Sequence, residues 1–541
     1  MDAVSTVPAA RNEPVRDYAP GSPERKSIES ALASLAANRL ELPMTIGGAQ
    51  HMAGGEPIDV VMPHRHAHVL GTTANATGDD ARAAADAALA AAPQWRDMSF
   101  DERASIFLKA ADLLAGPWRD RLNAATMLGQ SKTVYQAEID AACELIDFLR
   151  FNVQFAREIL AEQPISGPGI WNRLDHRPLE GFVYAITPFN FTAIAGNLAT
   201  APALMGNTVV WKPSPTQQFA AHHLMALFTE AGLPPGVINM VTGDGRAVSD
   251  ALLADPNLAG IHCTGSTAVF QHLYSTVGAN IAQYRSYPRI VGETGGKDFV
   301  LAHPSADVDV VRTALIRGAF EFQGQKCSAA SRAYLPRSLW TRLRDDLVGQ
   351  TESLTMGDVS DLSNFMGAVI DERSFARLDA VQKRAAADPT LTVLAGGTAD
   401  DSEGFFVRPT LIEGTDPTNE VFAKEFFGPI LSIHVYEDAP FESVISHIDE
   451  TSSYALTGAV IAQDRRAVET ALHGLRFAAG NFYINDKPTG AVVGQQPFGG
   501  GRASGTNDKA GSPLNLLRWT SPRAVKETFV PATGHQYPHQ G

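Results

Sequence analysis

The feature of this 541-residue chain that most constrains its fold is a regular alternation of two kinds of apolar segment between residues 182 and 282. Short runs suited to strands, at 182–187 and 208–212, alternate with longer segments of helical spacing, at 192–204 and 218–232. Strands that alternate with helices predict βαβ units and a doubly wound parallel sheet, an α/β fold with helices on both faces. A nucleotide would bind such a sheet outside the carboxyl ends of its strands.

A second alternating region, at 300–515, indicates a second α/β domain and a cleft between the two. Upstream, a capping box at Ser99 and Glu102 predicts the start of a helix, and the apolar spacing of 133–161 predicts one long amphipathic helix. We expect an N-terminal arm at 1–26, a nucleotide-binding domain at 27–165 and 183–302, a catalytic domain at 303–514, and arms that pack on another subunit at 166–182 and 515–541.

The charge balance argues against some functions. The chain has 44 Lys and Arg against 59 Asp and Glu, a formal net charge of −15. An acidic excess disfavours nucleic acid and anionic membranes, both of which attract a basic face. Residues 1–27 lack the apolar core of a signal peptide, and Pro and Asn residues break the uncharged stretch between Glu180 and Lys212. We therefore expect a soluble, cytoplasmic protein.

Three cysteines stand far apart, at positions 143, 263 and 327, without the spacing of a metal site, so no metal is expected. An odd count suits a reducing compartment. Cys327 follows Lys326, whose charge would favour the nucleophilic thiolate, although any single cysteine can equally be a small buried residue. Glu293 has glycines around it, which predicts a loop. It is either a general base or a surface charge.

The signs of a dinucleotide site are scattered, because no G-x-G-x-x-G follows a strand. Gly243-Asp244-Gly245 opens one strand-to-helix turn without the third glycine. Gly265-Ser266-Thr267 follows another strand and is either a phosphate cradle or an ordinary helix N-cap. Lys212 ends a third strand, where it would reach a ribose hydroxyl or remain a surface lysine.

Six motifs together resemble the aldehyde dehydrogenase superfamily and occur in that family's order. They are Pro188-Phe189-Asn190-Phe191, Trp211-Lys212-Pro213-Ser214, Thr264-Gly265-Ser266, Glu293-Thr294-Gly295-Gly296-Lys297, Gly324-Gln325-Lys326-Cys327 and Glu425-Phe426-Phe427-Gly428-Pro429. The resemblance implies a Rossmann-like NAD-binding domain, an α/β catalytic domain and a small oligomerisation arm. It also implies the oxidation of an aldehyde.

The resemblance implies a role for each matching residue. Cys327 would attack the aldehyde, Asn190 would help to stabilise the oxyanion, and Glu293 would activate the water that hydrolyses the thioester. NAD would be the cofactor. The residues that would hold it are Pro188, Lys212, Ser214, Gly243, Gly265, Ser266, Glu425 and Phe427.

A closer resemblance, to the 1-pyrroline-5-carboxylate dehydrogenase branch of the family, spans nearly the whole chain. It rests on 482–487, 493–500 and 503–509. It implies oxidation of L-glutamate gamma-semialdehyde in proline catabolism, a homo-oligomer, and transient contact with a separate proline dehydrogenase. Residues implied to bind the substrate are Glu144 for its ammonium, Ser328, Gly490 and Ala491 for its carboxylate, and Phe191 and Phe498 for its aliphatic chain.

Three positions depart from the family's pattern. Phe270 replaces a glycine, Pro215 replaces a glutamate that would repel a 2′-phosphate, and Ala491 replaces a serine found in some close relatives. Without the resemblance, Glu144 would be read as a charge on the solvated face of the long helix. The alternatives in function are a succinate-semialdehyde type of enzyme, a Cys/Glu hydrolase and a non-catalytic role.

Overall fold

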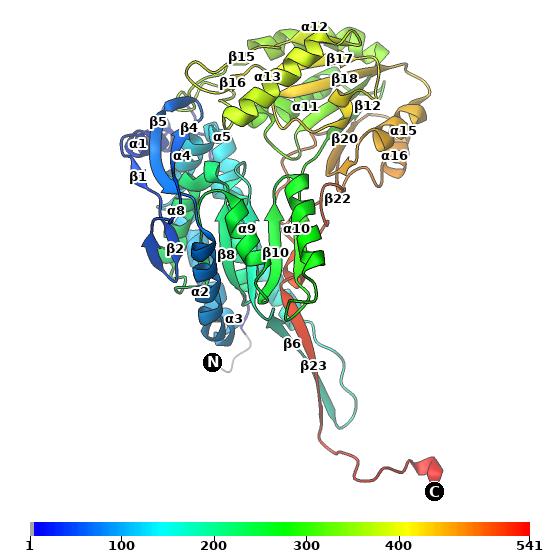
Figure 1. Ribbon diagram of the computed structural model, residues 1–541. Coiled ribbons are helices and arrows are strands. Elements are labelled where there is room, and N and C mark those ends of the chain that lie inside the picture. The colour runs from blue at the N-terminus through cyan, green and yellow to red at the C-terminus, as the bar shows by residue number, and fades with distance from the viewer. Residues whose placement is uncertain (1–4) are drawn as a thin grey trace.

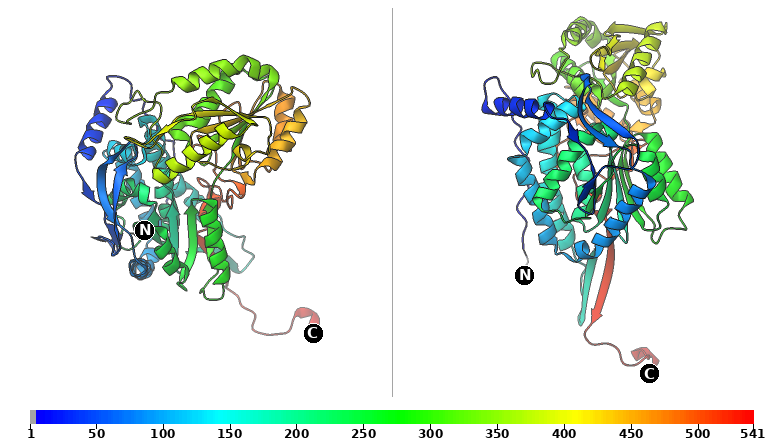
Figure 2. Two further views of the ribbon diagram at one scale, coloured as in Figure 1. Left: turned by 45° about the horizontal axis from the view of Figure 1, so that its top comes forward. Right: turned by 60° about the vertical axis from the view of Figure 1, so that its left-hand side comes forward.

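The computed structural model describes residues 5–541, so the first four residues of the expected N-terminal arm lie outside it. Two α/β lobes face each other, and a thin ribbon projects away from both (Figures 1 and 2). Each lobe is built on a seven-stranded sheet. The predicted α/β class with two domains matches this arrangement.

The first sheet has the order β11-β10-β7-β8-β9-β2-β3. Its strands are β2 (Met44–Ile46), β3 (Ala49–His51), β7 (Phe182–Thr187), β8 (Thr208–Pro213), β9 (Ile238–Met240), β10 (Leu258–Thr264) and β11 (Arg289–Glu293). The five from β7 to β11 are parallel. The chain runs outward from β7 through β8 and β9, and then crosses to β10 on the other side of β7. This reversal creates a crevice at the carboxyl ends of β7 and β10.

Helices cover both faces of this sheet, and successive side chains of each strand point to opposite faces. Phe182 and Tyr184 pack beneath α2 (Gly78–Asp97), α9 (Gly245–Leu253) and α10 (Thr267–Ala279). Val183 and Ala185 pack on the other side, beneath α3 (Phe100–Ala115), α6 (Leu145–Ala161), α7 (Thr192–Leu204) and α8 (Gln218–Ala231). The uncharged stretch from 181 to 211 is therefore the core of this lobe.

The second sheet has the order β14-β17-β18-β13-β12-β20-β21, with only β14 antiparallel. Its strands are β12 (Asp298–Ala302), β13 (Ala330–Pro336), β14 (Leu391–Ala395), β17 (Thr410–Gly414), β18 (Ile430–Tyr436), β20 (Thr457–Ile461) and β21 (Asn481–Ile484). Helices α11 (Val308–Phe320) and α12 (Arg337–Ser353) cover one face. Helices α13 (Glu372–Ala387), α15 (Phe441–Thr451) and α16 (Arg465–Gly474) cover the other.

The structure differs from the expected boundary at residue 302. β12 lies inside the second sheet, between β13 and β20, so the first sheet ends with Glu293 of β11 and the chain crosses between lobes at 294–297. The sequence hides this crossing because β11 and β12 are separated by only a short glycine-containing link.

The expected long helix over 133–161 is also interrupted. It consists of α5 (Val134–Ala137), a π-helical turn at Glu138–Glu144 and then α6. A π turn holds an extra residue and often marks a functional site. Ser99 does cap α3 with Glu102 in a complete capping box, as predicted.

The smaller elements complete the lobes. They are α1 (Pro23–Ala36), β1 (Leu40–Glu41), β4 (Pro57–Met62), β5 (Arg65–Ala74), α4 (Arg119–Gln130), β15 (Ala399–Asp400), β16 (Phe406–Val407), α14 (Glu420–Ala423), β19 (Tyr454–Ala455), β22 (Gly501–Arg502) and α17 (Pro513–Leu517). Because α1 begins at Pro23, the extended arm is shorter than expected. The projecting ribbon pairs β6 (Ile170–Pro178) with β23 (Thr520–Thr528) along their whole lengths.

Candidate active site

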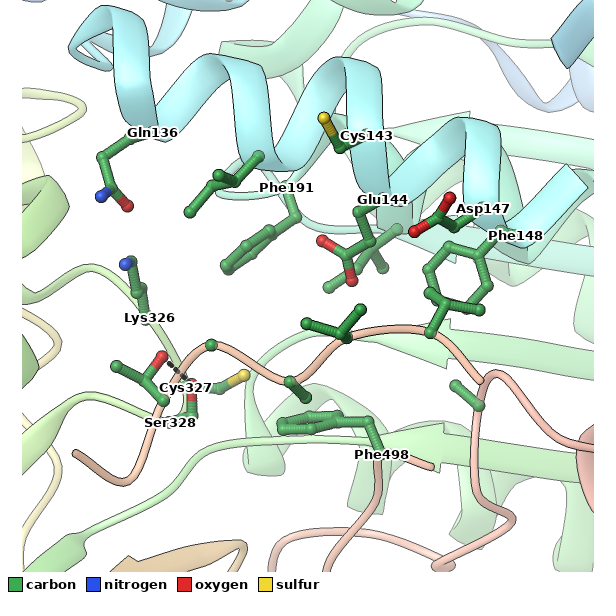
Figure 3. A pocket seen from close by; sticks show the side chains of 18 of the residues that line it. Gln136, Cys143, Glu144, Asp147, Phe148, Phe191, Lys326, Cys327, Ser328 and Phe498 are labelled. Carbon is green, nitrogen blue, oxygen red and sulfur yellow. Dashed lines mark hydrogen bonds between the residues drawn. The ribbon is translucent and has the colours of Figure 1, made fainter. Parts of the chain in front are cut away.

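A cavity of about 800 Å³ lies between the lobes, large enough for a small-molecule ligand. Its walls come from α5 and the π turn, the start of α7, the end of β11, the segment before β13, and the loop 487–498. The sequence-predicted residues that it brings together are Glu144, Phe191, Glu293, Cys327, Ser328, Gly490, Ala491 and Phe498. Figure 3 shows that Phe191 and Phe498 approach the cavity from opposite walls.

Cys327 is held by a strained turn. Phe322, Gln323 and Gly324 have φ values of 52°, 55° and 62°, and a Cβ on Gly324 would come within 2.4 Å of the Gly428 carbonyl oxygen. The Gln323 amide fixes this turn by donating to the carbonyls of Ser131 at 3.0 Å and Ala368 at 2.6 Å. Left-handed residues persist only where the surroundings impose them, so the turn places Cys327 rigidly.

The thiol of Cys327 is buried, and burial raises its pKa well above the usual range. Three nearby carboxyl groups raise it further, those of Asp298, Glu293 and Glu425. The expectation that Lys326 would favour the thiolate is wrong for this structure. The Lys326 ammonium instead lies 3.3 Å from Glu321 Oε2, where it forms an ion pair. The surroundings of the thiol therefore favour its neutral form.

Glu293 is not on a loop, as its glycine neighbours suggested. It ends β11, paired with Thr264 of β10. Gly292 must be a glycine because a Cβ there would lie 2.1 Å from the Phe270 ring. The missing side chain at 292 leaves room for Phe270, one of the three residues that depart from the family's pattern. Burial raises the pKa of Glu293 well above the ordinary value, an effect that the charge of Lys509 reduces. Burial therefore disfavours the charged form of this carboxyl group.

Asn190 is tied to the nucleophile segment. It is buried just before α7, and its side-chain amide donates to the carbonyl oxygen of Gln325 at 3.0 Å. A primary amide has two N–H groups, so one bond leaves a second donor. A single hydrogen bond therefore connects Asn190 to Gln325, which lies two residues before Cys327.

A buried network that sequence reasoning missed supports Asn190 and Phe191. Helix α7 lacks a side-chain cap of its own, and Asp140 of the π turn takes that place by accepting from the backbone N–H groups of Thr192 and Ala193 at 3.0 and 2.8 Å. Asp140 also accepts from Lys132 at 2.6 Å. The Lys132 ammonium lies 4.2 Å from the centre of the Phe191 ring, a cation–π contact.

The residues expected to hold a cofactor lie at the carboxyl ends of neighbouring parallel strands. Pro188 follows β7, Lys212 and Ser214 end β8, Gly243 follows β9, and Gly265 and Ser266 follow β10. Lys212 is buried rather than on the surface, and its ammonium donates to the Gly243 carbonyl at 3.2 Å. Burial lowers the pKa of Lys212 to about 8. Gly243 has φ of 84° and lies against Asn75, so only glycine fits there.

Ser266 is a helix N-cap, and its hydroxyl accepts from Val269 N–H at 3.3 Å. Beside it, a Cβ on Gly265 would meet nothing within 4 Å, so open space faces the start of α10. A helix N-terminus with free space in front of it fits a phosphate group. These residues therefore fit a dinucleotide at the crevice between β7 and β10.

Glu425 and Phe427 approach from the second lobe. Glu425 Oε1 accepts from Gly296 N–H at 2.9 Å, and a Cβ on Gly295 would lie 2.2 Å from the Glu425 carboxyl group. The glycine pair at 295 and 296 thus admits this carboxyl group, whose pKa burial raises to about 7. Phe427 has φ of 54° and meets the Phe189 ring edge-on, with 5.8 Å between the ring centres.

Glu144 faces the cavity and not solvent (Figure 3). Burial raises its pKa to about 8, and the nearby carboxyl groups of Asp140 and Asp147 add to the effect. Asp147 lines the same cavity three residues further along the helix. A buried carboxyl group with a raised pKa gains most from a cationic partner.

The other end of the cavity is basic. Ser328 and Thr489 share a hydrogen bond of 2.8 Å beside Gly490, which has φ of 100°. The walls here also carry three cations that the sequence analysis did not single out, Arg317, Lys326 and Lys487. A Cβ on Gly490 would lie 3.6 Å from the Lys487 ammonium. Figure 3 shows Lys326 and Ser328 at one end and Glu144 and Asp147 at the other.

Comparison with known proteins identifies the family. The model of the aldehyde dehydrogenase family matches residues 51–525. The chain belongs to this family. The resemblance given by the six sequence motifs and the fold that it implied are thereby confirmed.

Three relatives show how much of the chain the family accounts for. The mitochondrial delta-1-pyrroline-5-carboxylate dehydrogenase of Dictyostelium discoideum is 49% identical over 99% of this chain and 97% of its own. The Delta-pyrroline-5-carboxylate dehydrogenase from Mycobacterium tuberculosis, in a crystal structure with NAD, is 65% identical with a TM-score of 0.97, covering 100% of both chains. Proline utilization A from Bdellovibrio bacteriovorus is 30% identical with a TM-score of 0.91, covering 98% of this chain and 55% of its own.

No helix within residues 5–541 is long and apolar enough to cross a membrane. In the same range, no three His, Cys, Asp or Glu side chains are grouped so that they could hold a metal ion.

The state of Cys327 gives a first prediction. Alkylation of this thiol by iodoacetamide should accelerate with pH without levelling off below about pH 9, because burial and neighbouring carboxyl groups raise its pKa above the ordinary 9.0. The rate is measured by mass spectrometry in a Cys143→Ala/Cys263→Ala background, where Cys327 is the remaining thiol.

Lys326→Met is the matched comparison, and it should leave this pH profile unchanged because Lys326 pairs with Glu321. A plateau below pH 8, or a profile moved to higher pH in Lys326→Met, would show that the lysine does activate the thiol.

Proposed function

We propose that the protein oxidises L-glutamate gamma-semialdehyde, the open form of 1-pyrroline-5-carboxylate, to L-glutamate with NAD in proline catabolism. The observation that carries this proposal is the cavity itself. It joins a cysteine and a buried carboxyl group to one acidic and one basic end. The substrate has an aldehyde between those charges of opposite sign. The names of the relatives at 49% and 65% identity support the same activity.

The chemistry assigned to the chain's residues proceeds in two stages. Cys327 adds to the aldehyde carbon and loses its proton, and the resulting oxyanion accepts hydrogen bonds from the Asn190 amide and the Cys327 backbone N–H. Loss of hydride from that carbon leaves a thioester. Glu293 then removes a proton from water, and the hydroxide releases the carboxylic acid and restores the thiol. Glu293 lines the same cavity as Cys327, which supports this role.

NAD would lie along the carboxyl ends of the first sheet. Lys212 and Ser214 would hold the adenine ribose, Ser266 the pyrophosphate, and Glu425 the nicotinamide ribose, with Phe427 beside the nicotinamide. Pro188, Gly243 and Gly265 would line the same crevice. When bound, NAD supplies the acceptor for the hydride. Pro215, which follows the ribose-binding motif, places no carboxylate there, so we do not expect strong discrimination against a 2′-phosphate.

The charges of the cavity set the direction of the substrate. Ser328 and the backbone of Gly490 and Ala491 would bind the carboxylate, assisted by the cations at that end. Glu144 would bind the ammonium, and Phe191 and Phe498 would enclose the aliphatic chain between them. The positive φ of Gly490 turns its backbone for this purpose.

The two enzymatic alternatives account for less of this site. A succinate-semialdehyde type of substrate has no amine, so it would offer Glu144, which faces the cavity, no hydrogen-bond donor. A Cys/Glu hydrolase would have no use for the residues at the carboxyl ends of β8 and β10. Membership of the aldehyde dehydrogenase family favours a dehydrogenase over a hydrolase.

A substrate comparison tests the proposal. Formation of NADH is measured at 340 nm with glutamate gamma-semialdehyde and with succinate semialdehyde, for the wild type and for Glu144→Ala. The wild type should prefer the amino-acid aldehyde. Glu144→Ala should reduce kcat/KM for it by about 10- to 100-fold, since a hydrogen bond to a charged group contributes about 1.5–3 kcal/mol.

Succinate semialdehyde should lose far less in Glu144→Ala, because it makes no such bond. If the wild type preferred succinate semialdehyde, glutamate gamma-semialdehyde would not be the substrate. Equal losses for both aldehydes would mean that Glu144 supports the helix and does not select the substrate.

We also propose where in the cell the protein acts and which protein it contacts. We propose a cytoplasmic location, which the three free cysteines favour, although the Dictyostelium relative is named as mitochondrial. We also propose transient contact with a separate proline dehydrogenase, because the chain matches about half of proline utilization A.

We propose that the ribbon of β6 and β23 joins copies of this chain into a homo-oligomer. It projects from the lobes with Trp171 51% exposed, and Phe529 just beyond β23 is 60% exposed (Figure 2). Large exposed apolar side chains on a projecting element mark an association surface.

Trp171→Asp combined with Phe529→Asp should lower the mass measured by sedimentation. Met52→Asp, at an exposed position just after β3 and outside both predicted arms, is the control and should not change it. A wild type that sediments as a monomer, or a double variant whose mass is unchanged, would contradict the proposal that the ribbon joins copies of this chain.

A further inference from the structure

The N-terminal segment forms part of the cavity wall. We call residues 10–18 the N-terminal strap. It contains no helix or strand, and it runs along the π turn and α6. Asn12, Glu13 and Val15 of the strap line the same cavity as Cys327 and Glu144.

Asn12 uses its whole side-chain amide to connect two separate elements. Its Nδ2 donates to Asp147 Oδ2 of α6 at 2.8 Å and to the carbonyl oxygen of Val493 at 2.8 Å. Its Oδ1 accepts from Gln495 Nε2 at 2.9 Å. An amide has two N–H groups and one carbonyl, so all of its polar groups are engaged. Asn12 is therefore a clamp between α6 and the loop 487–498.

Glu13 holds Asn12 in place. Its backbone N–H donates to Asp147 Oδ1 at 2.7 Å, and its carboxylate lies 2.5 Å from Arg119 and 2.8 Å from Arg150. Both ion pairs are largely shielded from solvent, and such charge-assisted contacts are the strong ones. The strap is thus fixed at the residue next to the clamp.

The clamped elements carry the two groups that would recognise the substrate's charges. Asp147 lies three residues after Glu144, and Val493 lies three residues after Gly490. The loop and the helix also touch where Gly494 has no Cβ, since one would lie 2.4 Å from the Phe151 ring. That contact is apolar and has no preferred direction, whereas the hydrogen bonds of Asn12 are directional and set a register.

We propose that Asn12 is a positioning residue that sets the spacing between Glu144 and the Gly490–Ala491 backbone, and thereby selects aldehydes that carry both a carboxylate and an amine. The inference rests on the proposed function. An aldehyde with a carboxylate alone needs the loop but not its spacing from Glu144. Loss of the clamp should therefore affect one class of substrate and spare the other.

The test compares glutamate gamma-semialdehyde with glutarate semialdehyde, which has the same chain and carboxylate but no amine. Asn12→Ala should raise KM for the first by about five- to tenfold, the loss expected for a net 1–1.4 kcal/mol, with kcat unchanged. For glutarate semialdehyde KM should stay within about twofold. Asn12→Leu keeps the approximate shape and loses all three bonds without adding a charge beside Asp147, so it should behave like Asn12→Ala.

Gln154→Ala is the matched control. Gln154 accepts from Ala10 N–H at 2.9 Å, so this variant removes a bond to the same strap without touching the cavity. It should leave both KM values unchanged. If Asn12→Ala does not fold, Gln495→Ala removes one of the three bonds of the clamp and should show the same selectivity at smaller size.

Equilibrium binding gives a second readout that needs no turnover. Calorimetry with L-glutamate and with glutarate should show that Asn12→Ala weakens glutamate alone. Unchanged KM values, or equal rises for both aldehydes, would overturn the inference and leave the proposed function standing. A wild type that fails to oxidise glutamate gamma-semialdehyde while oxidising glutarate semialdehyde would instead overturn the proposed function.

Discussion

The rest of the site depends on the buried carboxylate of Asp140, which holds Lys132 and the start of α7 in place. It neutralises Lys132 at 2.6 Å and caps α7 through two backbone N–H groups, and Lys132 lies against the ring of Phe191. Removing one partner of a buried ion pair costs about 3–5 kcal/mol because the other charge is left unpaired. Asn190 and Phe191, for which we propose the roles of oxyanion donor and aromatic wall, both stand at the end of α7 that this carboxylate holds. The π turn is what brings Asp140 inward to that helix while Glu144 faces the cavity.

Burial at the site raises the pKa of four acidic groups. Burial raises the pKa of Glu144 to about 8 and that of Glu425 to about 7, and it raises those of Glu293 and Cys327 well above their ordinary values. Groups perturbed in this way cluster at functional sites, because a buried acid is ready to accept a cation or to exchange a proton. Their stability cost follows from linkage. Between the ordinary pKa near 4.5 and about 8, Glu144 is protonated in the folded chain and ionised in the unfolded one, so it makes the protein less stable as pH rises.

The sequence was most informative where local pattern and global fold agree. The strands and helices from 182 to 279 could be predicted because each buried element is a short apolar run with a clear turn after it. The boundary at 302 was wrong because β12 is as apolar as its neighbours and only strand pairing assigns it to the second sheet. The π turn could not be seen, since one extra residue per turn leaves helical spacing almost intact.

The parts of the site that could not be predicted from the sequence depend on contacts between residues far apart in the chain. Glu293 was taken for a loop residue because its glycines looked like turn formers, whereas Gly292 and Gly295 are there to admit Phe270 and Glu425. The bonds from Asp140 to the start of α7 and the Asn12 clamp join segments far apart in the chain, and no local pattern marks such partners. The family resemblance predicted roles for the site residues, and the structure brings several of those residues together around one cavity.

The most direct measurement is a crystal structure of the protein with L-glutamate, the proposed product. The account predicts that the α-carboxylate binds at Ser328 and the Gly490–Ala491 backbone, that the α-ammonium binds Glu144, and that the side-chain carboxylate lies against Cys327 and Asn190. Glutamate bound in the reverse direction, with its α-carboxylate at Cys327, or bound outside this cavity, would contradict it.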